Sequence, residues 1–196
     1  MVDSAPPARL VVGFGGSSSP TSVTSQLLRR CLELTEQRGA RTAAFTGAEL
    51  ALLPIFSSGG DANAAAEMVA AVRAADAVVI ATPGYHGGMS GLVKNALDHL
   101  ELLRDDRRPY LDGRPVGVIV AASGWQACGT TLVSVRSTVH ALRGWPTPFG
   151  LTVNSAEHPP ADGGAFDPRV EGALAVLAGQ LMDFVSWRAA ANGSAR

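Results

Sequence analysis

Three short stretches of the chain are rich in glycine and hydroxyl side chains and could bind a polar ligand together. They are residues 16–24 (GSSSPTSVT), 82–88 (TPGYHGG) and 123–129 (SGWQACG). Each follows an apolar run, and the first two lead directly into sequences with helical spacing. The start of a helix attracts anions, because its first backbone N–H groups are unpaired and carry partial positive charge. We therefore treat these three stretches as candidate binding loops.

The first loop has the composition of a phosphate-binding loop. Ser17, Ser19, Ser22 and Thr24 supply hydroxyl donors beside the start of a helix. The loop is not a Walker loop, since no Gly-Lys-Ser/Thr follows, and Ser18 stands where a GxGxxG pattern needs its third glycine. An ordinary strand-to-helix turn with a Ser/Thr cap is the alternative that these residues leave open.

The second and third loops could hold a flat heteroaromatic ring between them. Glycine-rich backbone offers donors to the polar edge of such a ring, while Tyr85 and His86 offer contacts to its face. His86 lacks a Ser, Cys or acidic partner at triad-like spacing, which argues against a general base. Trp125 could close over the same ring or could simply pack in its loop, and Cys128 could be structural or reactive.

Apolar runs alternate with helical patterns along the chain. Strands are expected at 9–14, 41–45, 77–81, 115–122 and 145–153, and helices at 23–37, 61–74, 89–103, 131–142 and 167–190. The apolar segment 49–56 is broken by Pro54 and is expected to be a loop packed on the core. This alternation predicts an α/β fold, a flavodoxin-like three-layer sandwich around a five-stranded parallel sheet of order 2-1-3-4-5. In that order the three loops meet at the carboxyl edge of the sheet.

Composition limits the remaining possibilities. The 196 residues are 46% hydrophobic and 17% charged, which predicts one domain over 9–190, with a loose arm at 1–8 and a frayed end at 191–196. A formal net charge of -1 argues against nucleic acid or an anionic membrane as the main partner. No signal peptide, disulfide framework or metal-ligand spacing is recognisable, so we expect a cytoplasmic protein without a metal.

The sequence from Pro83 to Asp98, PGYHGGMSGLVKNALD, resembles the signature P-x-Y-[NH]-x-x-x-x-G-x-L-K-N-A-L-D of the NAD(P)H-dependent FMN reductase family. The first loop is similar to the family's phosphate loop, G-S-x-R-x-x-S-x-[NT]. That family is flavodoxin-like and includes flavin reductases of two-component monooxygenases and reductases of quinones, azo dyes and chromate. The resemblance implies FMN, reduced by NADPH or NADH in a ping-pong reaction with a flavin or quinone-like acceptor. No catalytic side chain is then needed, because hydride transfer depends mainly on positioning.

The resemblance also implies where the cofactor binds. The phosphate would lie at Ser17, Ser22 and Thr24, and the ring would face Ser123 and Gly124 while resting on the second loop, at Pro83, Gly84, Tyr85, His86 and Gly87. Family members form dimers or tetramers through the helix expected at 89–103, which implies a homodimer or homotetramer, with a monooxygenase as a further partner.

Two positions depart from the family pattern. Ser19, which we keep among the FMN contacts, stands where the family usually has arginine, and Trp125 and Gln126 crowd a third loop that is often a run of glycines. We expect Trp125 and Gln126 to govern substrate access. These departures leave room for a biosynthetic flavoenzyme acting on a pathway intermediate. A flavodoxin-like electron carrier is a non-enzymatic alternative, although such carriers are usually strongly acidic.

Overall fold

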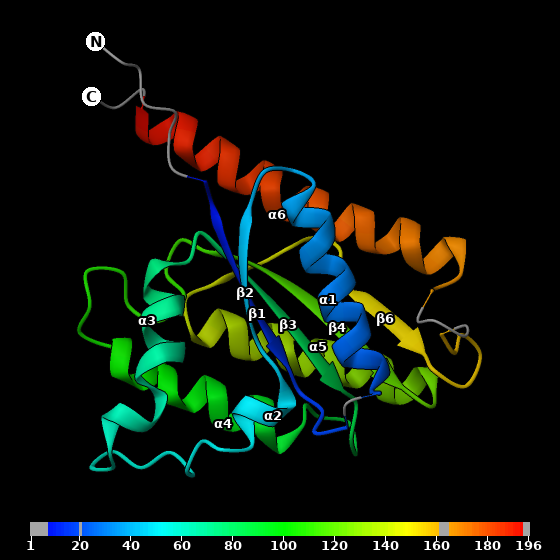
Figure 1. Cartoon of the computed structure of the whole chain (residues 1–196), viewed down its shortest axis with the longest axis horizontal. Helices are drawn as coiled ribbons and strands as arrows, with labels where there is room; N and C mark the ends of the chain where they lie inside the picture. Colours follow the sequence, from blue (N-terminus) through cyan, green and yellow to red (C-terminus); the bar gives the residue numbers. More distant parts are fainter. Residues whose placement is uncertain (1–7, 20, 161–164, 194–196) are drawn as a thin grey trace.

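The sheet lies at the centre of the molecule (Figure 1). The computed structural model describes residues 8–19, 21–160 and 165–193. Within them the strands pair in parallel in the order β2-β1-β3-β4-β5, with β6 also paired to β4. The predicted flavodoxin-like order is therefore confirmed. The strands are β1 (Leu10–Gly15), β2 (Arg41–Phe45), β3 (Ala77–Pro83), β4 (Pro115–Ala122), β5 (Trp145–Pro146) and β6 (Leu151–Asn154).

Helices cover both faces of the sheet. They are α1 (Val23–Glu36), α2 (Gly47–Leu50), α3 (Ala66–Ala74, preceded by the 3-10 turn Ala62–Ala65), α4 (Gly91–Asp98, continued by the 3-10 turn His99–Leu103), α5 (Trp125–Ala141) and α6 (Pro168–Gly193). Helices α1 and α6 share one core with the sheet, and α3, α4 and α5 share the other. Neighbouring residues of β3 face opposite cores, Val79 towards α1 and α6 and Ile80 towards α3 and α4. Burial on both faces explains why the central strands are continuous apolar runs.

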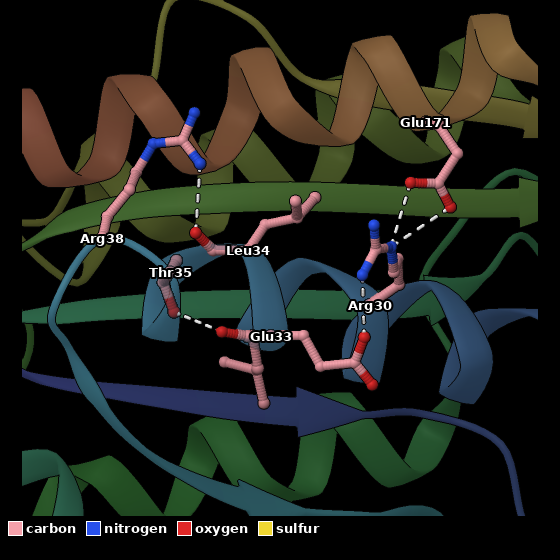
Figure 2. A network of polar contacts seen from close by, with 7 residues as sticks. Arg30, Glu33, Leu34, Thr35, Arg38 and Glu171 are labelled. Atoms are coloured by element: carbon pink, nitrogen blue, oxygen red, sulfur yellow. Dashed lines mark hydrogen bonds and ion pairs between the residues drawn. The ribbon is translucent and has the colours of Figure 1, made fainter.

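A polar network joins α1 to α6 (Figure 2). The Nε of Arg30 donates to both carboxylate oxygens of Glu171, at 3.2 and 2.9 Å, and its Nη1 donates to Glu33 at 3.0 Å. These hydrogen bonds raise the pKa of Arg30, and the one that Arg30 donates to Glu33 has the largest effect. Because both side chains are partly exposed, we expect at most about 1 kcal/mol from the pair. The apolar core between the helices therefore fixes most of the position of α1, whose first turn adjoins the first loop.

Several boundaries differ from the prediction, and two of these differences change the architecture. The strand expected at 145–153 is split into β5 and β6, because the chain leaves the sheet around Pro148. The third loop is shorter than expected, since α5 begins at Trp125 instead of Thr131. Gly129, which looked like a loop residue, lies inside this helix on an open side where a Cβ would meet no atom within 4 Å. Only Ser123 and Gly124 remain between β4 and α5.

The segment after β2 was also misjudged in part. Leu50 is buried at the end of α2, but Leu52 and Ile55 are each 84% exposed, so most of 49–56 does not pack on the core. Polar contacts hold this loop instead. The carbonyl of Pro54 accepts from Asn95 Nδ2 at 2.9 Å and lies 3.0 Å from His99 Nε2, which belongs to the 3-10 turn after α4.

At the ends of the chain, α6 continues to Gly193, beyond the expected end at 190. Residues 1–7 of the expected arm and 194–196 of the expected frayed end lie outside the described residues. Among the helices that the structure describes, none combines the length and hydrophobicity required to cross a bilayer.

Candidate active site

A cavity of about 590 Å³ lies at the carboxyl edge of the sheet, beyond the ends of β1, β3 and β4. The first, second and third loops all contribute to its lining, as the strand order predicts. Of the predicted site residues, it is lined by Ser17, Ser19, Ser22, Thr24, Pro83, Gly84, Tyr85, Ser123 and Gly124. Residues separated by more than 100 positions in the sequence therefore share one concave surface.

Ser22 begins helix α1 at the end of the cavity that holds the first loop. Its Oγ accepts from the backbone N–H of Ser25 at 3.1 Å and lies 2.7 Å from Thr24 Oγ1. Ser22 is therefore an N-cap, which is the alternative that the sequence left open, and it also lines the cavity. The other N–H groups of this first turn have no acceptor within the helix, and hydroxyl groups lie beside them. Together they favour an anion at this end of the cavity.

Two glycines permit the close packing that fixes the position of the first loop. A Cβ on Gly16 would lie 2.5 Å from Val93 Cγ2 and 2.8 Å from Ser90 Oγ, both at the start of α4. A Cβ on Gly47 would lie 1.8 Å from the carbonyl oxygen of Ser17. Since real Cβ atoms never approach so closely, the first loop depends on glycine at both positions. The role of Gly47 was missed by the sequence reasoning, which assigned no element to residues 46–48.

The second loop is fixed at both ends. Thr82 is fully buried, and its Oγ1 accepts from the N–H of Ser90 at 2.9 Å and donates to the carbonyl of Pro83 at 3.0 Å. Gly84 donates its N–H to Ala121 of β4 at 2.8 Å. A Cβ on Gly84 would lie only 3.0–3.2 Å from atoms of Thr131, Ala122 and Ala127, so glycine favours this close approach to β4 and α5. The loop is thus positioned by buried groups and not by its exposed tip.

The tip of the second loop is a tight turn from Tyr85 to Gly88. The two residues exchange backbone hydrogen bonds of 3.0 and 2.9 Å, and His86 and Gly87 both have positive φ angles, of 53° and 82°. This is the conformation of a type I′ turn, which favours glycine. His86 is exposed, and neither His86 nor Gly87 lines the cavity, whereas Tyr85 lines it and remains 55% exposed.

Trp125 and Gln126 also lie outside the cavity lining. The Trp125 Nε1 donates to Glu157 at 2.9 Å and its ring meets that of His158 edge-on. Trp125 instead lines a neighbouring groove beside strand β6. Gln126 is exposed within α5. Both residues belong to a helix that begins at Trp125, so the expectation that they crowd the third loop is wrong.

Both cysteines are fully buried. Cys31 lies on the inner side of α1, and burial raises the pKa of its thiol to about 12. Cys128, whose role the sequence left open, points into the protein, and its Sγ lies 3.4 Å from the carbonyl of Val153. Burial raises the pKa of Cys128 as well. Within the described residues no group of three or more His, Cys, Asp or Glu side chains could hold a metal ion.

The cavity also has lining residues that were not predicted, namely Val23, Ala121, Ala122, Ala127 and Ser155. Most are small apolar residues, which give no sequence signal of their own. Ser155 directly follows β6, and its N–H donates to the carbonyl of Ala122 at 2.9 Å. It lies two residues beyond the end of the predicted strand 145–153, at the same sheet edge as the three loops, but no motif singled it out.

Comparison with known proteins identifies the family. The model for NADPH-dependent FMN reductases matches residues 10–158, which include every loop described above. The chain belongs to the NADPH-dependent FMN reductase family. The predicted resemblance is thereby confirmed, as is the prediction of an enzyme that uses FMN, and the family description names NADPH as the reductant.

Individual relatives agree with this membership. An FMN-dependent NADPH-azoreductase of Staphylococcus aureus (strain USA300) is 27% identical over 180 residues, which are 87% of this chain and 92% of the relative. Another, from Staphylococcus haemolyticus (strain JCSC1435), is 31% identical over 118 residues, and that match spans 59% of each chain. The solved structure of a flavoenzyme NAD(P)H:(acceptor) oxidoreductase from Paracoccus denitrificans superposes with a TM-score of 0.71 at 20% identity, covering 92% of this chain and 97% of that one.

The cavity of this FMN reductase family member fits its cofactor. Its volume is within the range of about 300–1,000 Å³ that is usual for ligand sites. Hydroxyl donors and the start of α1 provide for a phosphate at one end. At another part of the lining, a Cβ on Gly124 would meet no protein atom within 4 Å, so the space beside this backbone is open.

Proposed function

We propose that this protein oxidises NADPH and reduces a small, flat acceptor through FMN held in the cavity, in a ping-pong reaction. The observation that carries the proposal is the single cavity that joins the hydroxyls of Ser17, Ser22 and Thr24 to the loops at Pro83–Tyr85 and Ser123–Gly124. A site for an anion and a site for a planar group are thus combined at one sheet edge. The chemistry that FMN supplies when bound is hydride acceptance and passage of the two electrons onwards.

The residues of the chain bind and orient in this proposal. Ser17, Ser19, Ser22 and Thr24 hold the phosphate together with the first turn of α1. Pro83, Gly84 and Tyr85 support one side of the ring, and Ser123 and Gly124 face it. We place no general base beside the ring, since His86 lies outside the cavity lining. Buried groups such as Thr82 hold the second loop still, which serves a hydride transfer that depends on distance and alignment.

We propose an azo compound, a quinone or free flavin as the acceptor. The relatives named as azoreductases favour the first of these. Tyr85 remains half-exposed at the rim, which leaves one side of the cavity accessible to a second substrate.

We further propose that the chain forms a homodimer or homotetramer through α4 and that a monooxygenase could draw on its reduced flavin. On α4, Lys94 and Asp98 form an exposed ion pair at 2.6 Å, as opposite charges four residues apart on a helix commonly do.

The test is anaerobic reduction of the purified, FMN-loaded protein by NADPH, followed by initial rates with an azo dye, a quinone and free FMN. The proposal predicts bleaching of the flavin near 450 nm and parallel double-reciprocal lines when both substrates are varied. A flavin that stays oxidised with NADPH and NADH would refute the reductase and favour the electron carrier or the biosynthetic enzyme. Intersecting lines would refute the ping-pong order alone.

A further inference from the structure

Arginine side chains surround a second cavity at the opposite edge of the sheet. This cavity, of about 380 Å³, is lined by Arg73, Asp106, Arg107, Arg108 and Arg114. Arg73 is in the last turn of α3, and Arg114 directly precedes β4. The other three residues belong to the connection from the 3-10 turn after α4 to β4, residues 104–114. The arginine cavity thus lies at the amino ends of β3 and β4, away from the FMN site.

Arg114 forms the floor of the arginine cavity and is fully buried. Its guanidinium donates to the carbonyls of Ala75 at 3.1 Å, Tyr110 at 3.1 Å and Arg73 at 2.8 Å. Each of its three nitrogens thus has one acceptor, but carbonyl oxygens carry no net charge. Burial, with smaller contributions from nearby arginines, lowers the pKa of Arg114 to about 10. A buried cation without a carboxylate partner is costly, so an added negative charge here is favourable.

Two further arginines in the lining also lack carboxylate partners. Arg108 donates only to the carbonyls of Asp112 and Ala75, at 3.3 and 3.4 Å, which are long bonds for a guanidinium. Burial and the charge of Arg188 lower the pKa of Arg108. Arg107 is exposed, and among the described residues it has neither a hydrogen bond nor an ion pair. Their N–H groups are therefore available to a ligand.

The nearby carboxylates do not balance this positive charge. Asp106 is paired with Arg73 at 2.6 Å, and Asp76 lies 3.6 Å from Arg9 and accepts from the N–H of Leu10. Asp112 attracts Arg108 electrostatically but forms no ion pair with it. On the far side, Arg188 of α6 adds a further cation and donates to the carbonyl of Gly113. The number of arginines without a carboxylate partner therefore exceeds the number of unpaired carboxylates near this cavity. These arginines are Arg107, Arg108, Arg114 and Arg188.

We propose that the arginine cavity binds a phosphate group, either as inorganic phosphate or as a phosphomonoester. Guanidinium groups present planar pairs of donors that match phosphate oxygens, and several cations around one cavity suit a dianion better than a chloride ion. The bound group would connect α3, the 104–114 connection and β4. Because it lies at the edge of the sheet opposite the flavin, this site is independent of the proposed hydride transfer.

The test is isothermal titration of the FMN-loaded protein with inorganic phosphate, glycerol 2-phosphate and, as a reference, chloride at equal ionic strength. Bound FMN occupies the hydroxyl-lined cavity, which keeps that site out of the measurement. We expect saturable binding of at least one phosphate probe, a higher melting temperature with it than with chloride, and no saturation by chloride. The probe that binds more tightly distinguishes the free ion from the phosphomonoester.

Single substitutions locate the site. Arg107→Gln and Arg108→Gln should each weaken phosphate binding by about tenfold, the worth of one charge-assisted contact. Arg104→Gln is the matched control, because Arg104 is in the same connection but pairs with Glu101 at 3.2 Å and does not line the cavity. Arg107 has no partner in the described structure, so its substitution should not disturb folding. Absence of saturable binding, or affinities unchanged in both cavity variants, would overturn the proposal.

Discussion

Gly47 lies against the carbonyl group of Ser17, so closely that a Cβ atom at position 47 would be 1.8 Å from the carbonyl oxygen. The turn after β2 therefore determines where the first loop can lie. Gly47→Ala must displace that loop, because the neighbouring atom is backbone and cannot rotate away. We expect FMN affinity to fall by tenfold or more, about 1.4 kcal/mol, and the free energy of unfolding to fall by about 1–3 kcal/mol. Fluorescence titration with FMN and urea unfolding of the apoprotein measure the two effects.

Gly59→Ala is the control for this substitution. Gly59 is exposed, and a Cβ there would meet no atom within 4 Å. It should bind FMN as the unsubstituted protein does. Equal FMN affinity in both variants would show that the first loop does not depend on its contact with Gly47.

Ser22 allows the proposed phosphate site to be tested by charge alone. Its side chain caps α1, and aspartate and asparagine cap helices about as well as serine. Ser22→Asp should therefore leave the free energy of unfolding of the apoprotein within about 0.5 kcal/mol, yet weaken FMN binding by tenfold or more because of repulsion from the phosphate. Ser22→Asn, which has a similar shape without the charge, should bind FMN more tightly than the aspartate variant. If the two variants bind FMN equally, the phosphate does not lie at Ser22.

Thr82 tests whether the position of the second loop matters for hydride transfer. Its buried hydroxyl joins both ends of that loop through Ser90 and Pro83. Thr82→Val keeps the shape but leaves the N–H of Ser90 without its acceptor, which should cost about 1–3 kcal/mol of stability. We expect slower reduction of bound FMN by NADPH, measured by anaerobic stopped flow, and recovery in Thr82→Ser. A rate unchanged in the valine variant would mean that the loop keeps its position without this hydroxyl.

The sequence sufficed for the strand order because each central strand is a continuous apolar run, and for the second loop because Pro83–Asp98 carries a long signature. It did not suffice where chain geometry decides. The start of α5 at Trp125 was hidden by Gly124 and Gly129, which resemble loop residues. The exposure of Leu52 was hidden because polar contacts from Asn95, and not apolar burial, hold that loop. The clash that fixes glycine at position 47 comes from a loop 30 residues earlier, which no local pattern reports.

Glu49 gives a pH dependence to the turn that carries Gly47. Its carboxylate accepts from the hydroxyl and the N–H of Thr46, and these hydrogen bonds, the hydroxyl first, hold its pKa below the usual 4.5. A group with a lowered pKa in the folded state stabilises it above the ordinary pKa, and this stabilisation is lost as the pH falls through the lowered value. Because Glu49 is exposed, we expect only about 0.5 kcal/mol. Glu49→Gln should be less stable than the unsubstituted protein at pH 6 in urea unfolding, and the difference should shrink as the pH falls below 4.5. A difference independent of pH would contradict this.

Cys31 and Cys128 should both be unreactive in the folded protein. A thiol reacts as its thiolate, and both thiols are fully buried with raised pKa values. We expect no reaction with Ellman's reagent at pH 8 in the native state and reaction of both cysteines in 6 M guanidinium chloride. Cys128→Ser keeps a donor for the carbonyl of Val153 and should retain NADPH oxidation within about twofold. Fast labelling of Cys128 in the native protein would contradict this prediction. So would loss of activity in a stably folded Cys128→Ser variant, which would give Cys128 a part in the reaction.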